Sequence, residues 1–137
     1  MRKTPPDALV LPLEVPFHDV DALRIVWHGH YLKYFELART ALMRARGLDV
    51  ADVIALGYRQ LVIESSCRHS FPLHYGDPFE VQVRVGELTH RIRFDFVVWN
   101  MKYDRRSARG STTLVTTDAD GNLLMETPHA IATRLRP

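Results

Sequence analysis

The sequence of 137 residues has one cysteine, no long apolar run and no excess of one charge. A single cysteine, Cys67, excludes an internal disulfide and is typical of a reducing compartment. Because Cys67 lies in an apolar run, we expect a small core residue there and not a nucleophile. No stretch approaches the roughly 20 apolar residues that a membrane span requires. We therefore expect a cytoplasmic protein without a membrane span.

The charges are nearly balanced, with 18 basic and 16 acidic residues and a formal net charge of +2. Basic and acidic residues alternate along the chain, so the pattern does not favour a nucleic-acid partner, although it suits a phosphorylated small ligand. The length predicts one domain, and its size requires no disulfide or metal to stabilise it.

The chain divides into a tail and one domain. Residues 1–11 contain two adjacent prolines and are expected to be a flexible tail, with a single domain over residues 12–137. Apolar residues recur at helical spacing from about His28 to Arg46, and Gly47 favours a helix end there. Leu32, Leu37 and Met43 widen the apolar stripe, so we expect this helix to be enclosed by other structure.

After this helix the apolar period changes to two. Phe79, Val81 and Val83 share one face of a predicted strand. Similar runs cover residues 61–71, 92–101, 111–117 and 123–135, and a hairpin turn is expected at 118–122. One strand, one long helix and several further strands predict an α+β domain in which an antiparallel sheet wraps a central helix.

Two carboxylates, Asp19 and Asp21, lie in the loop that leads into this helix. A carboxylate beside a helix N-terminus can attack or deprotonate, while the unpaired backbone N–H groups of the first turn receive negative charge that forms on a carbonyl oxygen. This pattern indicates acyl transfer. The alternative for Asp21 is a structural role in bracing its own loop.

The residues around this loop resemble a known family signature. Asp19-x-Asp21, Val26 and Tyr31, followed by Tyr34-Phe35-Glu36 and Arg39-Thr40, are similar to hotdog acyl-CoA thioesterases of the 4-hydroxybenzoyl-CoA thioesterase and YbgC-like types. The resemblance implies the hotdog fold and hydrolysis of an acyl-CoA or acyl-carrier-protein thioester. It also implies a homodimer joined edge to edge with the site at the subunit boundary, or a homotetramer of two such dimers.

The resemblance also implies roles for individual residues. Asp21 is the catalytic carboxylate, and the backbone N–H groups of His28 and Gly29 form the oxyanion hole, with the His28 imidazole beside them. The substrate-binding residues are expected to be Tyr31, Arg24, Arg91 and Arg93, of which the last two would meet the coenzyme A phosphates. The family usually has glycine at the position of Arg24, so a different loop path or an altered acyl pocket is expected.

Several alternatives stay open from the sequence. Asp21 could act as nucleophile or as general base. The same residues could serve hydration or dehydration of an acyl thioester, or the chain could be a non-catalytic acyl-thioester or carrier-protein binding module. His28 and His30 lack further ligands at zinc-like spacing, so neither a metal nor a cofactor is expected. A basic cluster in a predicted connection between strands is solvated or contacts phosphate; it comprises Arg105, Arg106 and Arg109.

Overall fold

The computed structural model describes residues 3–137, which form five strands, three α-helices and a short 3-10 helix. The elements are β1 (Leu9–Glu14), η1 (Phe17–Asp19), α1 (His30–Ala45), α2 (Val50–Ala55), β2 (Tyr58–His69), β3 (Pro78–Glu87), β4 (Ile92–Asn100), β5 (Arg105–Asp118) and α3 (His129–Leu135).

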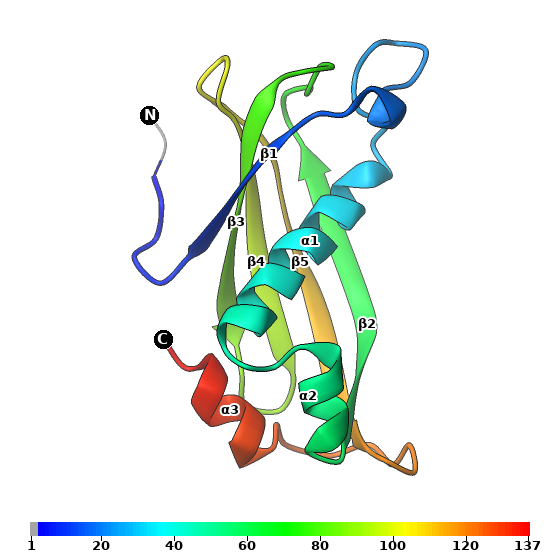
Figure 1. Ribbon diagram of the computed structural model, residues 1–137, viewed down its shortest axis with the longest axis vertical. Helices are drawn as coiled ribbons and strands as arrows, with labels where there is room; N and C mark the ends of the chain where they lie inside the picture. The colour runs from blue at the N-terminus through cyan, green and yellow to red at the C-terminus, as the bar shows by residue number, and fades with distance from the viewer. Residues whose placement is uncertain (1–2) are drawn as a thin grey trace.

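The strands form one antiparallel sheet in the order β1-β3-β4-β5-β2, and α1 lies across one face of it (Figure 1). Strand β4 shows why the sheet packs on the helix, since its residues alternate between buried and partly exposed. The ring of Phe96 in β4 stacks on Phe35 of α1, with centroids 4.5 Å apart. The predicted hotdog architecture of the α+β class is therefore confirmed.

Helix α1 is covered on one side only. The side chains that face the sheet are buried, among them Tyr34, Phe35 and Ala38. On the opposite side Leu32 is 41% exposed and Leu37 is 44% exposed. The expectation that other structure encloses the whole helix is therefore wrong for a single chain.

Three further expectations differ from the structure. Strand β1 begins at Leu9, inside the segment expected to be a tail, and Asp7 forms an ion pair with Arg84. The segment 123–135 is not a strand, because Ile131, Ala132 and Leu135 sit at helical spacing and are buried by α3. The basic cluster at 105–109 belongs to β5 and not to a connection.

Strand β2 is an unusual edge. It pairs with β5 on one side, and within the described chain no strand pairs with its other side. Its central residues are exposed, with Leu61 at 53%, Val62 at 47% and Ile63 at 54%. A long apolar edge strand offers unpaired backbone groups to another chain, so this edge is a natural place for association.

None of the helices formed by residues 3–137 has the length and apolar character needed to cross a membrane.

Candidate active site

Asp19 fixes the loop that joins β1 to α1. Its side chain is 1% exposed and accepts hydrogen bonds from the Tyr34 hydroxyl, at 2.7 Å, and from the Lys33 ammonium group. Its backbone oxygen accepts from the Trp27 N–H at 3.0 Å. Asp19 thus contacts α1 through its side chain and Trp27 through its backbone. These contacts hold the segment between Asp19 and Trp27 beside the start of α1.

The ionisation of Asp19 follows from these contacts. Burial acts to raise the pKa of the Asp19 carboxyl, but the hydrogen bonds from Lys33 and Tyr34 and the positive charge of Lys33 outweigh it, so the pKa lies below its usual value. Asp19 is therefore a charged residue with a structural role.

Asp21 sits in a tight turn closed by backbone hydrogen bonds. Its N–H donates to the Ile25 carbonyl at 2.9 Å, and its carbonyl accepts from the Arg24 N–H at 2.9 Å. The Leu23 N–H donates to Asp21 Oδ1 at 2.8 Å, which orients the carboxylate. Oδ2 takes part in none of the hydrogen bonds described for this chain, so one oxygen is held and the other is available to a substrate or water.

Arg24 occupies the position where the hotdog thioesterases that the sequence resembles usually have glycine. Its backbone φ angle is 65°. A non-glycine residue in the left-handed region pays a steric cost because Cβ approaches its own backbone. The expectation of a different loop path or an altered acyl pocket stays a prediction. The turn keeps a conformation that suits glycine and holds an arginine in it under strain.

Two backbone N–H groups just before α1 are unpaired among the described hydrogen bonds. Gly29 is the N-cap, and no side chain caps the helix. Among the hydrogen bonds described for the chain, none uses the N–H of His28 or of Gly29. A Cβ on Gly29 would lie 2.2 Å from the Trp27 ring, so this position requires glycine while the ring stays in place. The two N–H groups form an electropositive helix end suited to an oxyanion.

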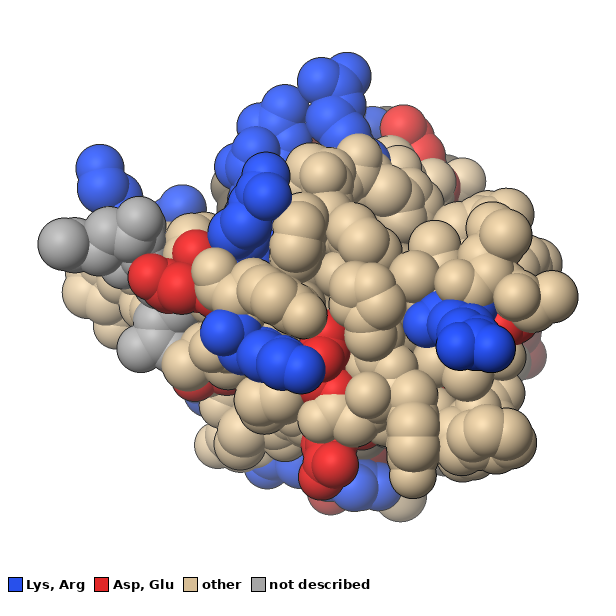
Figure 2. Space-filling view, turned by 90° about the horizontal axis from the view of Figure 1, so that it is seen from above, with Lys and Arg blue, Asp and Glu red and all other residues tan. Residues whose placement is uncertain are grey.

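A cleft of about 350 Å³ brings these parts together at the end of the molecule shown in Figure 2. The surface there is mostly uncharged, and the basic side chains gather most at one edge of the view. The residues that line the cleft are Asp21, Leu23, Ile25, Val26, His28, Tyr31, His69, Ser70, Phe71 and Pro72. Of the predicted site residues, the structure thus places Asp21, His28 and Tyr31 around one space.

His69 also lines this cleft, and the sequence assigned it no role. Its ring meets Tyr31 edge-on with centroids 4.7 Å apart, and its Nε2 lies 3.3 Å from the His28 carbonyl oxygen. Burial raises the pKa of Tyr31 to about 12, so its phenol is neutral. Burial also raises the pKa of neighbouring Cys67 to about 11, which keeps the thiol protonated and argues against a thiolate nucleophile.

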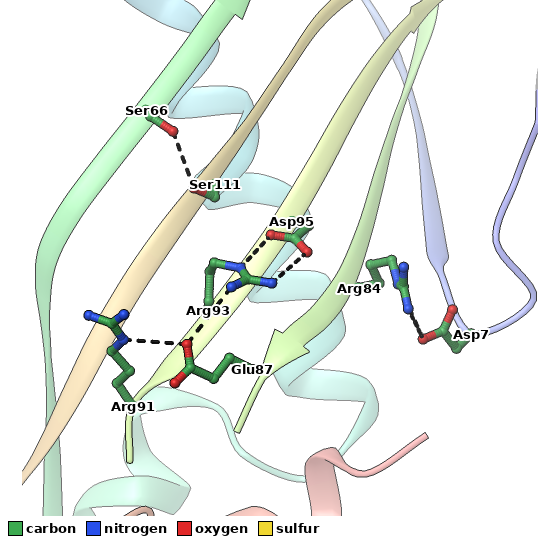
Figure 3. Close-up of polar contacts among 8 residues, drawn as sticks. All are labelled: Asp7, Ser66, Arg84, Glu87, Arg91, Arg93, Asp95 and Ser111. Carbon is green, nitrogen blue, oxygen red and sulfur yellow. Dashed lines mark hydrogen bonds and ion pairs between the residues drawn. The ribbon is translucent and has the colours of Figure 1, made fainter. Parts of the chain in front are cut away.

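Arg91 and Arg93 do not reach the cleft within one chain. They flank Ile92, whose side chain is buried in the core, so both guanidinium groups lie on the face of the sheet turned away from α1 (Figure 3). Arg91 pairs with Glu87 at 3.4 Å, and Arg93 pairs with Asp95 at 2.9 Å. Their placement follows from strand alternation, since neighbours of a buried strand residue point outward.

Arg105 of β5 lies closer to the cleft. Its guanidinium carbon is 4.2 Å from the centre of the Phe71 ring, and Phe71 lines the cleft. None of the ion pairs described for the chain involves Arg105 or Arg109. Arg109 is directly opposite Arg68 in the sheet, where two like charges face each other.

The fold and the cleft together define a hotdog domain with an acidic loop at a helix N-terminus. The chain belongs to the thioesterase-like superfamily, whose family model matches residues 15–135. A curated Aquifex aeolicus protein named "Putative esterase" is 34% identical over 98 residues, which cover 72% of this chain and 76% of that protein.

Solved structures show the same fold. A hypothetical protein from Aquifex aeolicus is 26% identical, with a TM-score of 0.85, and the match covers 93% of this chain and 99% of that chain. Slr0204, a 1,4-dihydroxy-2-naphthoyl-CoA thioesterase from Synechocystis, is 18% identical with a TM-score of 0.84, covering 93% of this chain and 95% of that chain. At 18% identity, the similarity to Slr0204 shows a shared fold and no more.

Replacing Arg24 with glycine is expected to stabilise the protein by about 1 kcal/mol, because glycine adopts positive φ without a Cβ clash. Arg24→Ala keeps the Cβ and removes the charge, so it serves as the matched control and should show no such gain. Urea unfolding of the two variants measures the difference. Equal stability of both variants would show that the backbone at this position is not strained.

Asp19→Asn is expected to lower the free energy of unfolding at pH 7 by about 1–3 kcal/mol, because the pairing with Lys33 is lost. The pKa of Asp19 is depressed in the folded state from an unperturbed 3.8, so its contribution is complete above that value and disappears as the pH falls through the folded pKa. The gap between wild type and variant should therefore shrink in acid. Exposed Asp120→Asn is the control, and a gap that persists unchanged at pH 2.5 would contradict this role.

Proposed function

We propose that this protein hydrolyses an acyl thioester of coenzyme A, or of a carrier protein's phosphopantetheine, to the free acid and thiol. The observation that carries the proposal is the arrangement at the cleft, where Asp21 and His28, the residue just before the uncapped N-terminus of α1, line one space. Family membership supports thioester hydrolysis but does not identify the acyl group of the substrate.

In the proposed reaction, the thioester carbonyl oxygen accepts hydrogen bonds from the N–H groups of His28 and Gly29. Negative charge that forms on this oxygen is stabilised there by the helix end. Asp21 either attacks the carbonyl carbon to give a mixed anhydride or takes a proton from the attacking water. The C–S bond breaks, water supplies the new C–O bond, and the leaving thiolate takes up a proton.

The strained turn counts against the binding-module alternative. A binding module without activity would follow if Arg24, in place of the glycine usual in the family, disrupted the reaction loop. In the structure the backbone of Arg24 adopts the left-handed conformation, and Asp21 lines the cleft. We therefore favour a functional site in this loop.

We further propose that two chains associate through β2. The exposed residues Leu61, Val62 and Ile63 would be covered, and the unpaired backbone groups of the edge would bond to a second β2 in antiparallel register. This association is the homodimer expected from the resemblance. The exposed Leu32 and Leu37 on α1 provide a further apolar surface for a larger assembly.

Asp21→Asn is expected to reduce thiol release from acyl-CoA substrates by at least about 100-fold, roughly 3 kcal/mol of barrier, because the amide can neither attack nor take a proton. The measurement is the rate of free thiol formation with aryl-, short-, medium- and long-chain acyl-CoAs. Asp120→Asn, on the distant hairpin, is the control. Release that is unaffected in Asp21→Asn would place the catalytic carboxylate elsewhere, and no release by wild type from any acyl-CoA or acyl-carrier thioester would overturn the proposed activity.

Arg105→Ala is expected to raise KM for acyl-CoA about tenfold and leave kcat nearly unchanged, since its guanidinium lies beside the cleft and would contact the coenzyme A phosphates in ground and transition states alike. The same acyl group on N-acetylcysteamine, which lacks phosphates, should show no change in KM. Arg91→Ala and Arg93→Ala, measured in the same assay, test the expectation from the sequence that these two residues bind the coenzyme A phosphates. A rise in KM for these two and not for Arg105→Ala would favour phosphate binding on the outer face of the sheet.

A further inference from the structure

His69, the last residue of β2, contacts the segment that leads into α1. Its Nε2 lies 3.3 Å from the carbonyl oxygen of His28, a residue 41 positions earlier in the chain. Its ring meets the buried ring of Tyr31 edge-on, with centroids 4.7 Å apart. Tyr31 thus supports the imidazole from the helix side, and the imidazole joins the end of β2 to the residue just before the N-cap of α1.

The contact with His28 decides which ring nitrogen of His69 carries a proton. A carbonyl oxygen can only accept a hydrogen bond, so Nε2 is the donor. The Cys67 sulfur, 3.5 Å from the same nitrogen, is a weaker acceptor, and burial raises the pKa of this thiol to about 11, so it stays uncharged. The His28 carbonyl is therefore the stronger partner of the Nε2–H. Nδ1 of His69 takes part in none of the hydrogen bonds described for the chain.

The His28 carbonyl and the Gly29 N–H belong to one peptide unit. The unit is planar and trans, so its N–H points away from its carbonyl oxygen, and a donor that holds the oxygen also sets the direction of the N–H. Gly29 has helical angles, with φ at −67° and ψ at −21°, which align this N–H with the free donors of the first turn. The Gly29 N–H is one of the two donors proposed above for the oxyanion.

The His28 carbonyl has a hydrogen bond without His69. The backbone N–H of Tyr31 already donates to the same oxygen at 3.4 Å. A second donor polarises the peptide further, which makes the Gly29 N–H a stronger donor, and it also restrains rotation of the peptide unit. Both effects matter most when negative charge develops on a carbonyl oxygen bound at this N–H.

We propose that His69 is a positioning residue of the oxyanion hole, whose Nε2–H holds the His28–Gly29 peptide so that the Gly29 N–H is directed at the thioester carbonyl oxygen. This inference rests on the proposed thioesterase function and adds a residue to its site. His69 acts through the His28 backbone and exchanges no proton with the substrate in this role. Because the benefit is greatest in the transition state, it should appear in kcat and leave KM nearly unchanged.

Two amide variants separate the donor from the ring. The side-chain nitrogen of glutamine lies as many bonds from Cα as Nε2 of histidine, so His69→Gln keeps a donor within reach of the His28 carbonyl. The nitrogen of asparagine is one bond closer to Cα and matches Nδ1, so His69→Asn loses the contact. His69→Asn is expected to lower kcat for acyl-CoA hydrolysis about tenfold with little change in KM, and His69→Gln should recover most of that loss. No loss in folded His69→Asn, or an equal loss in both variants, would overturn the proposal.

The tautomer of His69 can be measured on the wild-type protein, so this test does not depend on the folding of His69→Asn. Long-range proton–nitrogen correlation spectra, recorded where the ring is neutral, should show the proton on Nε2 and none on Nδ1. Comparison with His69→Gln identifies the ring signals among those of the seven histidines. A proton on Nδ1 alone would overturn the proposal, since His69 would then offer the His28 carbonyl no donor.

The backbone amide signal of Gly29 reports on the oxyanion hole without turnover. The chemical shift of an amide nitrogen responds to hydrogen bonding at the carbonyl of its own peptide unit, so the Gly29 signal should move in His69→Asn and return toward its wild-type position in His69→Gln. Both variants lack the imidazole, so its ring current does not explain a difference between them. The same Gly29 shift in both would contradict the proposal.

The two kinds of measurement distinguish failure of this inference from failure of the proposed function. If wild type hydrolyses no acyl thioester, the proposed function is wrong, and the tautomer and the Gly29 signal still decide whether His69 holds this peptide. If wild type is active while His69→Asn keeps its kcat, the thioesterase function stands and the role of His69 is wrong. Thermal unfolding confirms that each variant is folded before its kinetics are compared.

Discussion

The buried carboxylate of Asp19 is the interaction on which the rest of the site depends. A desolvated carboxylate is tolerated only when it is paired, and here Lys33 and Tyr34 of α1 supply the partners. The same residue accepts the Trp27 N–H through its backbone, so the loop cannot move without breaking contacts at both ends. The side chain of Asp21 accepts one described hydrogen bond, from the Leu23 N–H, so two aspartates two residues apart have different surroundings.

Local costs are found beside the cleft and also within the sheet, where Gln82 of β3 and Ser107 and Thr116 of β5 have buried side-chain atoms without hydrogen-bond partners among the described residues. Strand β4 alternates cleanly between buried and partly exposed residues, with every local preference in agreement with the fold. At one end of β2, Arg24 is held at positive φ and the helix N-terminus has no side-chain cap. At the other end, Arg39 and Gln60 are buried with unpaired donors. Of these costs, the strained Arg24 turn and the uncapped helix end adjoin residues of the cleft.

The parts that the sequence predicted are those encoded by short-range pattern. The helix that begins at His30 and strand β4 follow from periodicity, and Asp21 and His28 follow from a local signature next to that helix. His69 was missed as a residue of the cleft, because it reaches the cleft through contacts with elements far away in the sequence. His69 joins Tyr31 only after β2 has paired in the sheet, and the helix at 129–135 was taken for a strand because a short apolar run fits both periods.

Strand β2 connects the cleft with the exposed edge of the sheet. It carries a wall of the cleft at His69 and a wall of a second cavity at Gln60, so its length separates the two spaces in one chain. Its outer edge is apolar and unpaired within the described residues. In the dimer proposed above, a second β2 would cover this edge. Because His69 belongs to the same strand, the cleft would then lie near the boundary between the two chains.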